Sequence, residues 1–374
     1  MRILIRQFLG KNHSWSVVGW GLADALIAMG HNVHLFSTDG IAHLPERLKS
    51  NLIGYTEENQ NTIIGNLPNP IYDAQISYTS LKNFPHLLGN GPKNRFGIWC
   101  YEWNGKNVLP NGFAKNYNYC DQLCAPSSFA KDVFINSGIP DSRIQVIPHG
   151  INAIDYQKSS TVKITTDKKY KIFSNIAQLH LRKNIPGLLE AYGKAFTKND
   201  DVTLILKCRD KSPKYPFDVS FQSIFGSFKK KFPNHAEVKI FSEFVDDMSD
   251  LYRSIDAVYT MSFCEGFYFP GLEGLAAGKL SIAPEYGGQL DFLNKDNSYL
   301  VSGSVVRADP KSMYWENKSN AVWFQPSVED AAEKLKLSYK NYEEINKKLD
   351  SQKPDIHQQY SWAAVAQQIL SLCQ

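Results

Sequence analysis

Two glutamates, Glu265 and Glu273, lie eight residues apart in a turn rich in glycine and proline. An apolar run at 257–261 precedes the turn, and a Leu/Ala-rich run that ends at Gly278 follows it. A strand, a turn and a helix in this order direct several backbone N–H groups, and the positive end of the helix dipole, toward one point. An anion such as a phosphate ester would be stabilised at that point.

The flanking residues assign a role to each carboxylate. Pro270 suits the first helical positions, where its missing N–H costs nothing. Glu273 is then expected in the first helical turn, where a carboxylate complements the dipole and can accept hydrogen bonds from a sugar diol. Glu265 is expected on the loop beside the same point. The alternative is that Glu273 only complements the helix dipole while Glu265 faces solvent, which the flanking strand and glycines disfavour.

Composition limits the classes of protein to consider. The 374 residues exceed the usual size of one domain, and an apolar share of 43% is enough for packed cores. A net charge of +4 does not indicate a nucleic-acid or membrane partner. The six cysteines include no C-x-x-C pair, which disfavours a zinc site and a disulfide framework. With no signal-peptide core or bilayer-spanning run in view, we expect a cytoplasmic protein, and a peripheral membrane contact stays open.

Short apolar runs alternate with amphipathic helical stretches in both halves of the chain, which predicts βαβ units and parallel sheets. We predict two doubly wound α/β domains, at 1–151 and 170–355. A polar connection at 152–169 joins them, and 356–374 forms a last helix. In such folds ligands bind at the C-terminal ends of the strands, in the cleft between the domains.

Capping residues and interruptions refine this prediction. Ser127 or Ser128 is expected to cap a helix that stops at Gly138, and Ser361 is expected to cap the last helix. Two stretches, 210–235 and 302–323, interrupt the alternation and are expected to be irregular insertions.

The 262–278 stretch resembles the Glu-x7-Glu motif of retaining GT-B glycosyltransferases, in particular the large family four. Residues 125–151 and 247–252 are also similar to that family, and the likeness covers about 120–301 well. It implies the GT-B fold, in which two Rossmann-like domains face each other and a C-terminal helix crosses back to the first. The 361–365 stretch resembles that helix.

The resemblance also implies residue roles on the side of a nucleotide-sugar donor. Glu265 would contact the donor sugar, and Glu273 would hold the ribose of the nucleotide. Lys183 aligns with a lysine that binds the diphosphate, where a fixed cation lowers the barrier to departure of the nucleotide. Gln178 stands at the usual arginine position, so Arg182 either substitutes for that arginine or is a solvated surface charge.

Further candidates lie on two turns and in the first domain. The Gly-Gly-x-x-Asp sequence at 287–291 resembles a Gly-Gly-x-x-Glu turn of the family, although an ordinary strand-to-helix turn explains it equally well. Tyr268 stands where the family usually has glycine, which leaves the donor sugar open. The remaining donor-binding candidates are Gly266, Phe267, Tyr268, Gly271, Leu272, Gly287 and Gly288. The acceptor-side candidates are Ser16, Tyr101, Glu102 and His149, the last of which can equally be a turn residue at a domain edge.

The function implied is retaining transfer of a sugar from a nucleotide-sugar donor to a hydroxyl of a glycan or lipid-linked saccharide. Departing phosphate would help to deprotonate the acceptor, so no protein nucleophile is needed. No cofactor and no metal are expected, because GT-B enzymes lack an Asp-x-Asp cation site. The acidic run at 246–250 does not match that motif and is interpreted as a helix start.

Several alternatives remain at this point. A sugar-nucleotide epimerase, a sugar-phosphate phosphorylase or a non-catalytic nucleotide-sugar or glycan-binding protein could use the same fold. A glycosidase would use the two glutamates as acid and nucleophile, which the phosphate-binding features disfavour. Lys229, Lys230 and Lys231 are interpreted as a solvated helix face, so transfer to a nucleic-acid base is the least favoured alternative.

Overall fold

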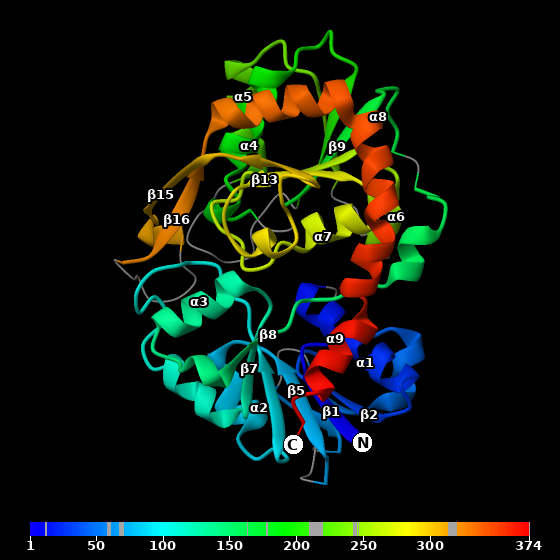
Figure 1. The fold of residues 1–374 in the computed structure, drawn as a ribbon, viewed down its shortest axis with the longest axis vertical. Coiled ribbons are helices and arrows are strands. Elements are labelled where there is room, and N and C mark those ends of the chain that lie inside the picture. The colour runs from blue at the N-terminus through cyan, green and yellow to red at the C-terminus, as the bar shows by residue number, and fades with distance from the viewer. Residues whose placement is uncertain are drawn as a thin grey trace. The chain divides into compact units, whose positions relative to one another are not determined.

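The computed structural model describes residues 1–374 except 12, 58–60, 67–70, 163, 177–178, 209–219, 242–244, 246, 313–319 and 374. The chain forms two compact units (Figure 1). The first consists of Met1–Tyr101, Lys106–Asn152 and Gln358–Gln374, and the second of Glu102–Gly105 and Ala153–His357. Each unit contains its own parallel sheet.

The first unit contains, within the described residues, an eight-stranded sheet in the order β4-β3-β2-β1-β5-β6-β7-β8. Its pairs are parallel except for β3 and β4, which are antiparallel. The central strands are almost wholly buried, as expected where helices cover both faces of a sheet. The strands are β1 (Arg2–Gln7), β2 (Asn32–Ser37), β3 (Leu52–Thr56), β4 (Ile63–Gly65), β5 (Ala74–Tyr78), β6 (Asn94–Ile98), β7 (Gln122–Ala125) and β8 (Ile144–Val146). The helices are α1 (Ser14–Ala28), α2 (Phe84–Leu88), α3 (Ser128–Asn136) and α9 (Trp362–Leu370).

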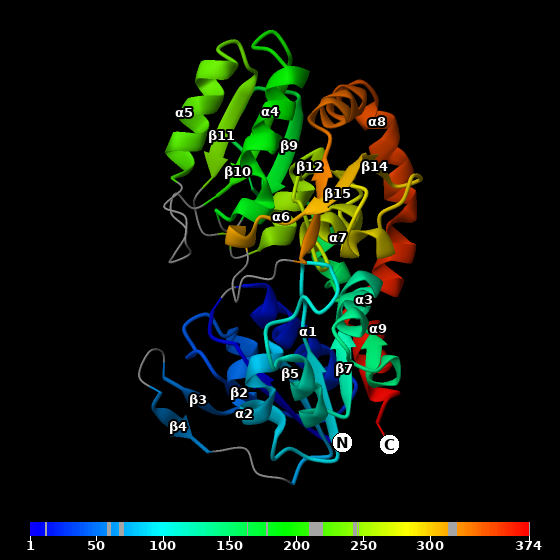
Figure 2. The ribbon, with the colours of Figure 1, turned by 90° about the vertical axis from the view of Figure 1, so that its left-hand side faces the viewer.

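The second unit contains, in the part of the chain described, a six-stranded parallel sheet in the order β11-β10-β9-β12-β13-β14 (Figure 2). The next two strands in the sequence, β15 (Gly303–Arg307) and β16 (Val322–Pro326), pair with each other as a separate antiparallel ribbon. The sheet strands are β9 (Tyr170–Asn175), β10 (Val202–Lys207), β11 (Glu237–Phe241), β12 (Ala257–Tyr259), β13 (Leu280–Pro284) and β14 (Ser298–Val301). The helices are α4 (Ile185–Ala195), α5 (Phe221–Lys231), α6 (Met248–Arg253), α7 (Phe269–Ala276) and the long α8 (Val328–Gln359).

The predicted helix caps are confirmed. Ser127 caps α3 by accepting a hydrogen bond from the Ala130 N–H, and Gly138 follows that helix with a φ of +91°. Ser361 caps α9 by accepting from the Ala364 N–H at 3.1 Å. These caps were predictable because each satisfies an N–H of its own first turn.

Helix α9 packs on the first unit although it ends the chain. The Ile151 N–H donates to the Tyr360 carbonyl at 2.7 Å, which fixes the start of the helix. The indole of Trp362 then lies directly on Gly21 of α1 and on Gly150. A Cβ added at Gly21 would come within 2.1 Å of the Trp362 ring, and one added at Gly150 within 2.6 Å. The last helix therefore packs on the first unit, as predicted, through contacts of the Trp362 indole with Gly21 and Gly150.

The two predicted irregular insertions are partly wrong. Residues 221–231 form α5, which Ser220 caps, and its aromatic side chains stack along one face. Residues 303–307 form β15, which pairs with β16. The interpretation of Lys229, Lys230 and Lys231 as a solvated helix face is confirmed, since they form the last turn of α5 and are exposed. The sequence did not indicate β15, because this strand is short and is flanked by polar residues. Residues 210–219 and 313–319 of these two stretches lie outside the described residues.

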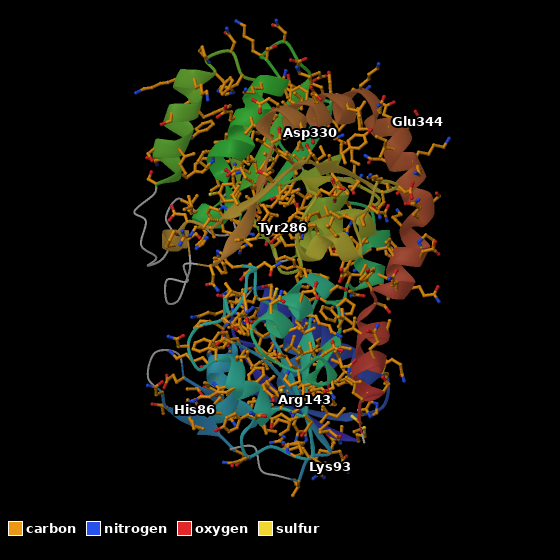
Figure 3. The ribbon with its side chains drawn as sticks, turned by 60° about the vertical axis from the view of Figure 1, so that its left-hand side comes forward. His86, Lys93, Arg143, Tyr286, Asp330 and Glu344 are labelled. Carbon is orange, nitrogen blue, oxygen red and sulfur yellow. The ribbon has the colours of Figure 1, made fainter. Side chains whose placement is uncertain are left out.

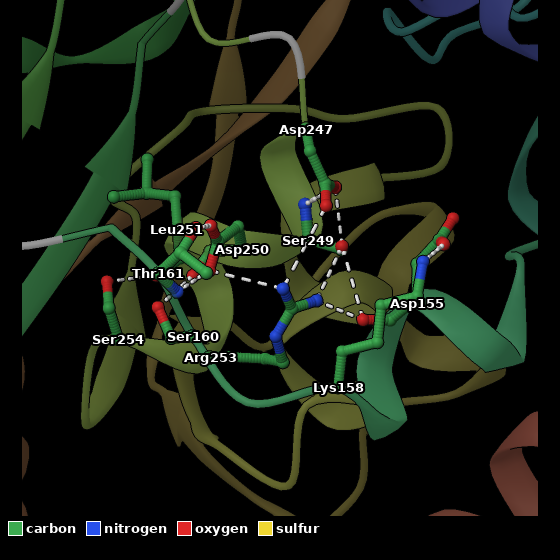
Figure 4. A network of polar contacts seen from close by, with 10 residues as sticks. All are labelled: Asp155, Lys158, Ser160, Thr161, Asp247, Ser249, Asp250, Leu251, Arg253 and Ser254. Carbon is green, nitrogen blue, oxygen red and sulfur yellow. Dashed lines mark hydrogen bonds and ion pairs between the residues drawn. The ribbon is translucent and has the colours of Figure 1, made fainter.

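The stretch expected as a polar connection is anchored in the second unit by a network around α6 (Figure 4). The Asp250 carboxylate accepts from the Thr161 N–H at 2.8 Å and pairs with Arg253 at 3.1 Å. Arg253 also donates to the Asp155 carbonyl. Asp247 caps α6, which confirms that the acidic run starts a helix, whereas Asp246 lies outside the described residues. The network holds 155–161 in place.

We predict that Gly21→Ala destabilises the protein, because the new methyl group would displace the Trp362 indole from its seat. Overpacking of this kind costs about 1–3 kcal/mol of unfolding free energy. Urea denaturation measures it. Gly226→Ala in α5 is the matched control, because its Cβ meets nothing within 4 Å, and replacing a helical glycine should stabilise by about 0.5–1 kcal/mol. A Gly21→Ala protein as stable as the wild type would contradict this packing.

Candidate active site

A buried cluster of four charged side chains lies in the second unit. The Glu265 carboxylate accepts from Arg182 Nη1 at 2.8 Å and from Lys183 Nζ at 2.6 Å. Arg182 Nη2 lies 3.3 Å from Oε1 of Glu102. Arg182 and Glu265 are each only 6% exposed. Two cations thus face two carboxylates in an environment largely closed to water.

Neighbouring strands bring these residues together. β9 and β12 are adjacent and parallel, so their C-terminal ends lie at one edge of the sheet. Arg182 and Lys183 form a 3-10 turn (Leu181–Lys183) after β9, and Glu265 follows β12. The Arg182 guanidinium donates to the Cys264 carbonyl at 2.8 Å, and the Phe263 N–H donates to the Arg182 carbonyl at 2.8 Å. Residues 82 positions apart are therefore joined by both backbone and side chains.

The cluster controls which of its members are ionised. Burial would raise the pKa of Glu265, but Arg182 and Lys183 outweigh burial and lower that pKa to about 2. Burial, aided by the two neighbouring cations, lowers the pKa of His180 to about 3, so this imidazole is neutral near pH 7. Glu102 differs, because burial raises its pKa and Arg182 only opposes that effect. Glu265 is therefore the permanent anion of the cluster.

Arg182 is not a solvated surface charge, which settles one of the two alternatives for this residue. Its side chain is buried and bonded to Glu265, next to Lys183. Gln178, at the usual arginine position, lies outside the described residues. The sequence could not decide this point, because an Arg-Lys pair in a turn is common on protein surfaces.

The glycine turn after β13 supports the backbone of Glu265. The Gly288 N–H donates to the Glu265 carbonyl at 2.8 Å. Gly287 has a φ of +100°, and a Cβ added there would lie 2.8 Å from the same carbonyl oxygen. Glycine is required at this position by both conformation and space. The turn therefore contacts the candidate site directly.

Glu273 occupies a different environment, and its predicted place in the first helical turn is wrong. Helix α7 begins at Phe269, so Glu273 is its fifth residue. The Tyr156 hydroxyl donates to Glu273 Oε1 at 3.5 Å. Burial raises the pKa of Glu273 to about 7, while hydrogen bonds from Tyr252 and Tyr156 oppose that rise. Sequence reasoning missed both tyrosines, because neither lies near Glu273 in the chain.

Tyr268 lies between the two glutamates in sequence and is electrostatically coupled to both. It has a φ of +69°, a left-handed conformation that is strained for a residue with a side chain. Its ring packs on Gly271, where an added Cβ would lie 2.6 Å away. Burial raises the pKa of its phenol well above the ordinary value, and the charges of Glu265 and Glu273 raise it further. Strain held by close packing is frequent at functional sites.

The other donor-side candidates surround this turn. The Phe267 ring meets Phe269 and Phe292 at 5.4 and 5.3 Å between ring centroids. Gly266 and Leu272 are buried. These residues shape the backbone and the apolar support of the turn.

Three acceptor-side candidates lie in the first unit and one in the second. Ser16 is buried in α1, with its N–H directed to His13 Nδ1 at 3.3 Å. The buried Tyr101 hydroxyl donates to the Val108 carbonyl at 3.3 Å. His149 Nε2 lies 3.1 Å from the Tyr78 hydroxyl, and burial lowers the pKa of this histidine to about 3. Glu102, in contrast, is paired with Arg182, which the sequence did not reveal.

Within the described residues, no group of three or more His, Cys, Asp or Glu side chains could hold a metal ion. Over the same residues, no helix combines the length and apolar character needed to cross a bilayer.

Comparison with known proteins identifies proteins that are similar to this chain in sequence or in fold. No protein-family model matches the chain. A glycosyltransferase of Methanocaldococcus jannaschii, described as uncharacterized, is 23% identical over 286 residues, which are 73% of this chain and 64% of the relative. The chain thus matches less than two thirds of that relative.

Several solved structures match nearly the whole chain, among them HepE and a sucrose-phosphate synthase. HepE of Anabaena in complex with UDP-glucose has a TM-score of 0.67 at 14% identity, with 99% of this chain and 98% of HepE covered. Sucrose-phosphate synthase of Thermosynechococcus elongatus has a TM-score of 0.68 at 12% identity, with the same coverage. The chain has the GT-B fold, with two Rossmann-like units and a C-terminal helix that returns to the first.

We predict that Glu273→Gln changes the pH dependence of stability. The pKa of Glu273 rises from 4.5 in the unfolded chain to about 7 in the folded one, so its ionisation opposes folding as pH rises through that window. The variant should therefore gain stability relative to the wild type between pH 4.5 and pH 8, by up to about 3 kcal/mol. Denaturant unfolding at both pH values measures this gain.

The control for this experiment is Glu344→Gln on α8, where the side chain is exposed (Figure 3). It makes the same chemical change in a solvated position and should keep the wild-type pH dependence. If Glu273→Gln gave the same stability difference at both pH values, the raised pKa would be refuted.

Proposed function

We propose that the chain is a retaining glycosyltransferase that transfers a sugar from a nucleotide-sugar donor to a hydroxyl of a glycan or lipid-linked saccharide. The GT-B fold and the glycosyltransferase relatives support the general activity. The observation that carries the proposal is the ionised Glu265, held by Arg182 and Lys183 at the C-terminal edge of β9 and β12. Cations at such an edge suit a phosphate group, and a carboxylate suits a sugar hydroxyl.

The proposed chemistry assigns the cations to the leaving group. When the bond between sugar and phosphate breaks, the nucleoside diphosphate gains negative charge, which Lys183 and Arg182 would stabilise. Fixed charges in a water-poor site are effective because they need no reorganisation during the reaction. The departing phosphate would take the proton of the acceptor hydroxyl on the same face of the sugar, so configuration is retained. This step requires neither a protein nucleophile nor a metal.

The two glutamates have separate tasks in this proposal. Glu265 is ionised and accepts hydrogen bonds from hydroxyls of the donor sugar. Glu273 binds the ribose diol, beside the hydroxyls of Tyr156 and Tyr252. HepE was solved with UDP and with UDP-glucose, so we propose UDP-sugars as the first donors to test.

Lys183→Ala should lower the kcat/KM for the donor by about 10²–10³-fold, because the charge that stabilises the leaving diphosphate is lost. Steady-state rates of nucleoside diphosphate release, with a panel of UDP-sugars and saccharide acceptors, measure it. Lys194→Ala is the control, since Lys194 pairs with Glu329 on the surface of α4 and should not affect transfer. Wild-type turnover by Lys183→Ala would overturn the proposed site.

Glu265→Gln should reduce kcat by a similar factor while the Kd for the nucleoside diphosphate changes little, because Glu265 is assigned to the sugar. Comparing the kcat with calorimetric binding of UDP separates the two effects. Equal loss of turnover and of UDP binding would contradict this assignment. Conversion of the donor to an epimer with no acceptor present would identify an epimerase instead.

A further inference from the structure

A short segment, Glu102–Gly105, belongs to the second unit, although the residues before and after it in the chain belong to the first. Trp103 is fully buried there, and its indole N–H donates to Ser312 Oγ at 3.3 Å. The Trp103 ring lies 6.1 Å from the His180 ring, and the Arg182 guanidinium lies 6.0 Å from its centroid. The segment is therefore packed against the turn that carries the cations.

Backbone pairing fixes the same segment from the other side. The Val322 N–H donates to the Asn104 carbonyl at 2.8 Å, and the Asn104 N–H donates back at 3.3 Å. Burial raises the pKa of Tyr286 to about 12, which its hydrogen bond with Asn104 opposes. The Tyr286 ring also stacks on that of Phe324 of β16, with 5.4 Å between the ring centroids. Glu102 is thus placed beside Arg182 by the packing of Trp103 and the backbone pairing of Asn104.

The charges of the cluster cancel before any ligand arrives. Arg182 and Lys183 supply two positive charges, and Glu265 and Glu102 supply two negative ones when both are ionised. The diphosphate of a nucleotide sugar would add two more negative charges. Such an excess of like charge in a water-poor site is unfavourable unless one carboxylate becomes neutral.

The two carboxylates are held unequally. Glu265 contacts two cations at 2.8 and 2.6 Å, and its side chain is 8% exposed. Glu102 contacts one cation at 3.3 Å, and its side chain is 22% exposed. Glu102 is therefore the carboxylate that a competing anion at Arg182 affects most.

We propose that the diphosphate of a nucleotide sugar binds at Arg182 and Lys183 together with one proton, which the Glu102 carboxylate takes up from solvent. The proposal rests on the proposed function, because it assumes that this anion is the ligand. One O–H bond forms on Glu102, and no covalent bond of the donor changes in this step. Glu102 releases the proton to solvent again when the nucleoside diphosphate leaves.

The groups around Glu102 agree with this assignment. Burial already raises the pKa of Glu102, and Arg182 and Lys183 are the attractions that oppose burial. A diphosphate would screen both cations and raise that pKa further. The neutral His180 is no competing proton acceptor, because burial lowers its pKa to about 3. Burial keeps the Cys264 thiol protonated by raising its pKa, and the cations keep Glu265 ionised.

Calorimetric titration tests the proposal on the full chain. UDP-glucose and GDP-mannose are the probes, since neither diphosphate diester titrates near neutral pH. Each is titrated at pH 7.5 in MOPS, HEPES and Tris, whose ionisation enthalpies differ, so that the slope of the observed enthalpy gives the number of protons bound. We expect uptake of up to one proton, and an affinity that falls by up to about tenfold per pH unit as pH rises.

Glu102→Gln should bind the same probe at least as tightly, with no proton uptake and a flat pH profile. Glu344→Gln, an exposed change on α8, should behave as the wild type. Binding without proton uptake by the wild type, or with equal uptake by Glu102→Gln, would overturn this inference and leave the proposed function intact. Failure of the folded wild type to bind either probe would overturn both. Glu273, whose pKa burial raises to about 7, is a second carboxyl of the proposed donor site that could take up a proton. Uptake that persists in Glu273→Gln therefore supports Glu102 even if Glu102→Gln does not fold, and uptake that is lost in Glu273→Gln would overturn the inference.

Discussion

The buried charge of Glu265 in the second unit must be compensated by the cations Arg182 and Lys183. Glu265 is almost wholly removed from water, and its bonds to Arg182 and Lys183 stabilise its ionised form. Loss of one partner from such a pair costs about 3–5 kcal/mol, because the remaining charge stays buried and unpaired. The turn after β9 and the loop after β12 must therefore keep their mutual register. The Gly287–Gly288 turn contributes to the same end by bonding the Glu265 carbonyl.

The features that could be predicted from the sequence are those that depend on residues close together in the chain. Alternating apolar runs indicate βαβ units because each run must be buried within its own strand or helix. Ser127 and Ser361 could be assigned as caps because each bonds an N–H three residues ahead. The helix at 221–231 was indicated only by the solvated face assigned to Lys229, Lys230 and Lys231, and its extent was not predicted, because its phenylalanines lie among polar residues.

Contacts between distant residues were outside the reach of that reasoning. Glu102 pairs with Arg182 across 80 positions, and Tyr156 reaches Glu273 across 117. Neither pairing leaves a spacing that a single sequence can display. The start of α7 near Pro270 could be predicted, and Pro270 lies at the first helical positions. The left-handed conformation of Tyr268 before it could not be predicted, because a non-glycine residue rarely adopts it. Solved structures that are only 12–14% identical share this fold, so the fold does not determine the details of the site. Those details depend on contacts between residues that lie far apart in the chain.

The two glutamates that dominate the sequence pattern differ in charge state because their neighbours differ. Two cations lower the pKa of Glu265 to about 2, whereas burial beside neutral tyrosines raises that of Glu273 to about 7. A carboxylate that is always ionised can only accept hydrogen bonds, which fits a partner rich in hydroxyl donors. A carboxyl that is partly protonated near neutral pH can both donate and accept, which matches a vicinal diol. The same residue type, on a loop and in the helix that follows it, thus acquires two charge states, because the environments separate the pKa values of the two acids.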